Sequence, residues 1–178
     1  MRRSVMCALV FVVVAGGFAC GAEPNDHLKG FAPFMGTWRH EGSVLEETPG
    51  AAAKGTKMVV RWTWTWILDN QIVMNDWIIE FQDGNKLSGK QLIGWNAAEK
   101  KIMAGGMNSM GAMGVCTIGI DGKAITTSSE DVEGDGRKTS SKLVMKQTDE
   151  DTFTFQVVER TGGDLVGPSP VYTFKRVK

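Results

Sequence analysis

The sequence predicts an all-β protein that folds as a single antiparallel up-and-down barrel of about ten strands. Apolar and polar residues alternate with a period of two almost throughout from Gly36 onward. Turn residues interrupt this alternation at regular intervals, and no helix of ordinary length separates the strands. A barrel is favoured over a sandwich because the chain reads as consecutive hairpins and because closure removes the exposed edges of a sheet.

The chain begins with the pattern of a signal peptide. A basic start precedes an apolar stretch over 5–15, and small residues up to Ala22 supply a cleavage site. We therefore expect a signal peptide over 1–22, a folded domain over 23–178, and a secreted or periplasmic protein. Two alternatives stay open: a retained membrane anchor, for which the apolar run is short, and a lipoprotein modified at Cys20, which lacks the usual aliphatic residue before it.

The composition argues against two classes of partner for the domain. The chain has 20 Lys+Arg and 20 Asp+Glu without a block of like charges, which argues against nucleic acid or an anionic membrane surface as the main partner. Removal of the signal peptide would leave Cys116 as the single cysteine. The core, and not a disulfide, must then hold the domain together.

Each element follows from its local pattern. Leu28, Phe31 and Phe34 recur every three residues, which predicts a short helical turn over 27–35. The segment 57–68 alternates best, and its apolar face holds Met58, Val60, Trp62, Trp64, Trp66 and Leu68. The other strands are expected over 36–45, 71–82, from Asp83-Gly84 to Trp95, and over 101–107, 113–120, 123–131, 138–147, 152–160 and 170–178.

Gly36-Thr37-Trp38 opens the first strand, and Arg176 lies on the last one. In this the chain resembles the lipocalin-like (calycin) superfamily, where a Gly-x-Trp and a late Arg pack together and close one end of the barrel. A guanidinium can stack on an indole while its N–H groups reach nearby carbonyls. The resemblance assigns barrel closure to Gly36, Trp38 and Arg176.

Further motifs look like those of a family of exported lipocalin-like domains of unknown function. They are Gly36-Thr37-Trp38-Arg39-His40-Glu41-Gly42, the Trp-rich second strand, Ile93-Gly94-Trp95-Asn96, Asp151-Thr152-Phe153-Thr154 and Glu159-Arg160. The resemblance spans roughly residues 28–178 and implies no particular function, because this fold hosts binders, carriers and a few enzymes.

Six Trp against a single Tyr point to an aromatic interior. If Trp38 faces inward, His40 on the same strand does so as well. Tryptophans of the neighbouring strands would add further rings to the interior. The expected lining consists of His40, Trp62, Trp64, Trp66, Trp77 and Trp95. The leading hypothesis is non-enzymatic binding of a small apolar or aromatic molecule. In the alternative, the indoles fill the barrel and the protein is a structural or interaction module of the cell envelope.

Evidence for catalysis or a cofactor is weak in the sequence. An enzyme that uses His40 is a further alternative, but neither a nucleophile elbow nor a phosphate-binding loop is present. The superfamily that the chain resembles includes barrels that bind haem through a His on a late strand, and haem is disfavoured here because no His follows His40. The methionines between Met103 and Met113, followed by Cys116, have a spacing that suits Cu(I), or they belong to a flexible hairpin. We predict no catalytic residue, no metal and no cofactor.

Overall fold

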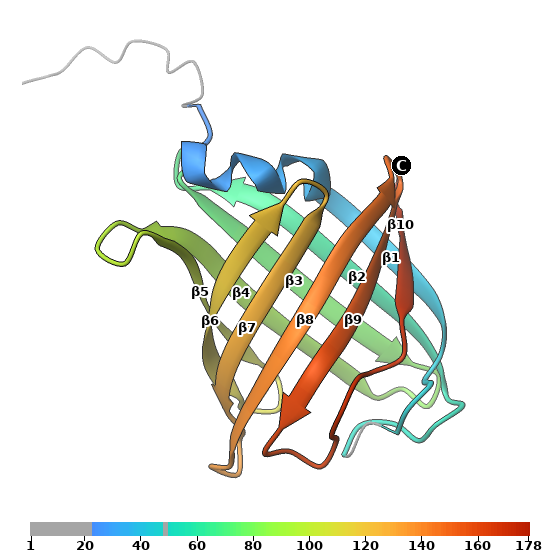
Figure 1. Cartoon of the computed structure of the whole chain (residues 1–178). Helices are drawn as coiled ribbons and strands as arrows, with labels where there is room; N and C mark the ends of the chain where they lie inside the picture. Colours follow the sequence, from blue (N-terminus) through green and yellow to red (C-terminus); the bar gives the residue numbers. More distant parts are fainter. Residues whose placement is uncertain (1–22, 48–49) are drawn as a thin grey trace, which may run out of the picture.

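The computed structural model describes residues 23–47 and 50–178 and shows ten antiparallel strands closed into one barrel (Figure 1). The strands are β1 (Gly36–Ser43), β2 (Lys57–Ile67), β3 (Ile72–Phe81), β4 (Lys86–Asn96), β5 (Lys101–Asn108), β6 (Met113–Asp121), β7 (Ala124–Val132), β8 (Lys138–Asp149), β9 (Thr152–Thr161) and β10 (Tyr172–Arg176). Each strand pairs with the next, and β10 pairs with β1. The all-β single barrel predicted from the sequence is confirmed.

The segments outside the described residues include the predicted signal peptide over 1–22, so that expectation stays a prediction. Within the described ranges, a 3-10 helix, η1 (Asp26–Phe34), precedes β1. No helix in these ranges is long and apolar enough to cross a membrane.

The turn between β2 and β3 departs from the expected pattern. Leu68 was expected on the apolar face of the second strand, but it is 71% exposed. Leu68, Asp69 and Asn70 all have positive φ, at 49°, 53° and 62°. This run of left-handed residues ends the strand alternation one residue early and turns the leucine outward.

One end of the barrel is closed by η1, which lies across it in Figure 1, whereas the β1–β2 and β9–β10 connections lie at the opposite end. Leu28, Phe31 and Phe34 point into the barrel and are at most 1% exposed, as the three-residue period of a 3-10 helix allows. The Phe31 ring centroid lies 5.7 Å from that of Trp64. The closed half of the barrel is therefore filled with side chains.

Arg176 fastens η1 to the barrel. Its guanidinium carbon lies 4.1 Å from the ring centroid of Trp38, and it donates hydrogen bonds to the carbonyls of Met35 (2.6 Å) and Pro33 (2.8 Å). Gly36 has φ 102°, and a β-carbon there would lie 3.3 Å from Nη1 of Arg176. The three residues that the resemblance assigned to barrel closure thus lie together at the closed end.

Candidate binding cavity

The open half of the barrel contains a cavity of about 480 Å³. Val44, Ala112 and Glu133, which lie in or beside the connections at the end opposite η1, form part of its lining. Cavities of this size are typical of sites for small organic molecules.

Aromatic side chains form one wall of the cavity. They come from β2, β3, β9 and β10 and are Trp62, Trp77, Phe155, Tyr172 and Phe174. The ring centroid of Trp62 lies 5.3 Å from that of Phe155 and 5.4 Å from that of Phe174. Closure of the barrel brings these rings together, because β2 reaches β9 only through β1 and β10.

Small residues on β5, β6 and the loop between them leave room on another side of the cavity. Gly106 of β5 and Gly114 of β6 are paired directly across the two strands, and both line the cavity with Ala112. The Asp131 side chain lies against the α-carbon of Gly114, where a β-carbon would overlap it. The cavity exists because large rings on one side are combined with small residues on another.

Asn75 is the most deeply buried polar group of the lining, at 1% exposure. Its Oδ1 accepts a hydrogen bond from Trp62 Nε1 at 2.5 Å. Because an indole nitrogen can only donate, this contact fixes the orientation of the amide. The Nδ2 group is left without a partner among the described residues.

Cys116 lies on the inner face of β6, two residues after Gly114, and is 4% exposed. Its Sγ accepts a hydrogen bond from Gln91 Nε2 at 3.3 Å. Burial, together with the negative charge of Asp131, raises the pKa of the thiol to about 11. A thiol held in its neutral form is a poor nucleophile, so the structure gives Cys116 no features of a catalytic thiol.

Of the residues expected to line a pocket, Trp62 and Trp77 line the cavity. Trp64 instead packs under η1, and Trp95 stacks on His27 with ring centroids 3.7 Å apart. Trp66, which pairs with Val73 across β2 and β3, is also outside the lining. These indoles stabilise the closed half of the barrel.

His40 is outside the cavity lining as well, although it packs edge-on against Tyr172 with ring centroids 5.4 Å apart. Its Nδ1 lies 2.8 Å from the carbonyl oxygen of Thr173. Because a carbonyl only accepts, Nδ1 is the donor in this contact. Nε2 is buried without a partner in the described part of the chain.

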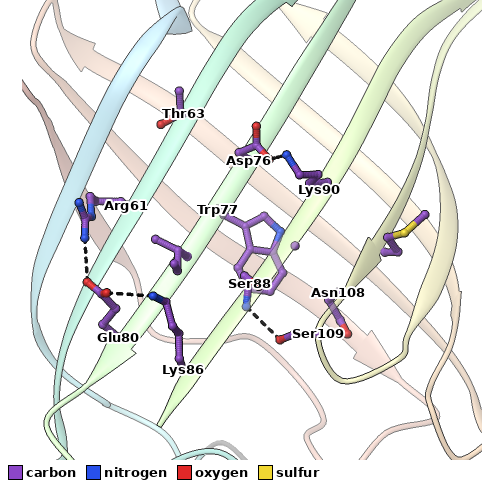
Figure 2. Close-up of a pocket in the computed structure, with 13 residues that line it drawn as sticks. Arg61, Thr63, Asp76, Trp77, Glu80, Lys86, Ser88, Lys90, Asn108 and Ser109 are labelled. Carbon is purple, nitrogen blue, oxygen red and sulfur yellow. Dashed lines mark hydrogen bonds and ion pairs between the residues drawn. The ribbon is translucent and has the colours of Figure 1, made fainter. Parts of the chain in front are cut away.

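A second hollow, of about 580 Å³, lies on the outer face of β2, β3 and β4 (Figure 2). Glu80 pairs there with Arg61 at 2.9 Å and with Lys86 at 3.3 Å, and Asp76 pairs with Lys90. The hydrogen bonds from Arg61 and Lys86 lower the pKa of Glu80. Exposed and mutually paired charges of this kind form a solvated face.

Three methionines on β5, on β6 and in the loop between them are largely exposed. Met107, Met110 and Met113 are 59%, 46% and 60% exposed. No group of three or more His, Cys, Asp or Glu side chains in residues 23–47 and 50–178 could hold a metal ion.

Models of known protein families gave no match to this chain, and a search of curated proteins gave none either. The functional inference therefore depends on the fold and on the geometry of the cavity.

The contact between Trp77 and Gly89 gives a first prediction. The indole lies across the inner face of Gly89, where a β-carbon would overlap the ring. Gly89→Ala should therefore push Trp77 into the cavity and lower the free energy of unfolding by about 1–3 kcal/mol. The control is Gly119→Ala on β6, where an added β-carbon meets no atom within 4 Å. Urea denaturation would measure both, and equal stability of the two variants would contradict the packing described.

Proposed function

We propose that this protein is a non-enzymatic binder of a small apolar or aromatic molecule, which occupies the cavity at the open end of the barrel. The observation that supports this most is the pairing of an aromatic wall, centred on Trp62, with the glycine wall at Gly106 and Gly114. A flat apolar ligand fits between two such walls, because rings supply contact area and glycines leave room.

We further propose that the domain belongs with the exported lipocalin-like proteins, and that it reaches a secreted or periplasmic location through a signal peptide cleaved near Ala22. The closed ten-stranded barrel and the stacking of Arg176 on Trp38 support the first part. The pattern of residues 1–22 supports the second.

A structural or interaction module is the second candidate, favoured by one surface feature. Met107, Met113 and Val132 are cross-strand neighbours on β5, β6 and β7, and all three are exposed. An apolar row of this kind could contact another macromolecule. An enzyme based on His40 has less support, because that side chain does not line the cavity.

Binding can be tested with N-phenyl-1-naphthylamine, a neutral aromatic probe whose fluorescence rises in apolar surroundings. Leu143 lines the cavity from β8, so Leu143→Trp should fill part of it and weaken binding by about tenfold or more, equivalent to about 1.4 kcal/mol. Leu92→Trp is the matched control, because Leu92 is 52% exposed and outside the lining. Circular dichroism would verify that both variants fold.

Native mass spectrometry of the protein isolated from its host gives an independent measurement. Extra mass that is lost on denaturation would support a bound molecule, and its value would separate an organic ligand from a metal. If the masses are identical and the probe does not bind, the binding proposal fails and the interaction module becomes the better candidate.

A further inference from the structure

We propose that the cavity selects organic cations: ligands with an apolar or aromatic body that lies against the aromatic wall and a protonated amine that pairs with Asp131 and Glu133 at the mouth. This inference rests on the proposed function and assigns the chemical class of the ligand.

Two carboxylates of the cavity lining lack a cationic partner among the described residues. Asp131 and Glu133 both line the cavity, at the end of β7 and just after it. The hydroxyl of Thr139 donates to Glu133 at 3.2 Å, which is a neutral contact. Neither carboxylate forms an ion pair with a cation of the described residues.

Cations near the cavity are already paired elsewhere. Lys90 belongs to the lining, but its ammonium group pairs with Asp76 on the outer face, as Figure 2 shows. Arg160 donates two hydrogen bonds to Glu46, at 2.8 Å and 3.0 Å. The negative charge of the mouth is therefore not neutralised by the protein's own Lys90 or Arg160.

Asp131 lies close enough to the interior for its negative charge to interact with groups inside the barrel. The carboxylate rests against the backbone of Gly114, and the raised pKa of Cys116 is caused in part by its charge, after burial. A charge that is half-buried in this way interacts more strongly with a counter-ion than a fully hydrated one does.

Two further features indicate that the cavity receives a ligand. The Nδ2 group of Asn75 is buried, lines the cavity and has no partner among the described residues. A ligand that reaches this depth can supply an acceptor atom. The aromatic wall, which includes Trp62 and Phe174, is the second feature, because it gives the apolar body of the ligand a surface to lie against.

The test compares three probes with one ring system: 2-naphthylmethylamine, which is protonated at neutral pH, neutral 2-naphthylmethanol and anionic 2-naphthoate. Titration calorimetry at low salt would measure each affinity for the wild-type protein. The amine is expected to bind about tenfold more tightly than the alcohol, and the carboxylate more weakly than either. Added salt should weaken amine binding and leave the alcohol nearly unaffected.

Asp131→Asn keeps the shape of the side chain and removes its charge, so it should reduce the preference for the amine over the alcohol about tenfold. Glu130→Gln is the control, because Glu130 is the preceding residue on β7, is exposed and is outside the lining. If none of the probes binds, the proposed function fails. If the alcohol and the carboxylate bind as well as the amine, or if Asp131→Asn keeps the preference, the cavity binds ligands without selecting cations.

Discussion

Replacing Trp38 by alanine is expected to lower the free energy of unfolding by about 3–5 kcal/mol, the range for deleting a large ring from a core. Trp38 is fully buried, and its Nε1 donates to the carbonyl of Phe34 at 2.7 Å. The substitution also removes the surface on which Arg176 stacks and the edge-on partner of Phe153, whose ring centroid lies 4.9 Å away. Removal of this ring is therefore expected to weaken the packing of η1 as well as that of the barrel wall.

Trp38→Phe separates these contributions, since it keeps an aromatic ring but loses the hydrogen bond to Phe34. Its expected loss is smaller, at about 1–2 kcal/mol. Denaturant unfolding followed by circular dichroism would measure both variants, and probe binding by the folded fraction should be retained, because Trp38 is not part of the cavity lining. A loss below about 1 kcal/mol for Trp38→Ala would contradict the closing role.

The second large effect is expected at Cys116, which should react with maleimide at pH 8 about a hundredfold more slowly in the folded protein than in urea. The pKa of the thiol rises from 9.0 to about 11, because of burial and the charge of Asp131. Two pKa units reduce the thiolate fraction at pH 8 about a hundredfold, and the thiolate is the reactive form. Mass spectrometry of the peptide that contains Cys116 would give the rate.

The same shift has a consequence for stability as a function of pH. Because the pKa is raised in the folded state, the folded protein favours the neutral thiol. The contribution of the buried neutral thiol to the free energy of unfolding is fully present below pH 9 and is lost as the pH rises toward 11. Over this window the wild-type protein should lose more stability than Cys116→Ala. Parallel pH profiles for the two proteins would contradict the raised pKa.

Strand positions and the closing residues could be predicted because they depend on local patterns. Alternation with a period of two shows which residues face inward, and it does so correctly for Trp62, Trp64 and Trp66. It carries no information on the height of a residue along the barrel. The height of each tryptophan along the barrel axis decides whether it fills the core or lines the cavity, because η1 fills the closed half around Trp64 and leaves space beside Trp62.

The rest of the site depends on contacts between distant segments. Phe155 and Phe174 face Trp62 only because β10 pairs with β1. In addition, the register between β8 and β9 shifts between Lys142 and Leu143, which changes the residues that lie opposite each other on these two strands. A local signal did exist for Asn75, which is a polar residue at an inward position between Val73 and Trp77. Gly106 and Gly114 at inward strand positions were a second signal, because glycines there indicate missing volume on the inner face.

The pairing of β1 with β10 also affects how fast the chain can fold. Trp38 and Arg176 are register partners, although almost the entire domain separates them along the chain. Joining such distant segments requires a large loss of chain entropy before any contact compensates for it, so barrel closure should be a late and slow step. An exported chain, as we propose this one to be, must stay unfolded until it has crossed a membrane. The late closing strand would give it that delay.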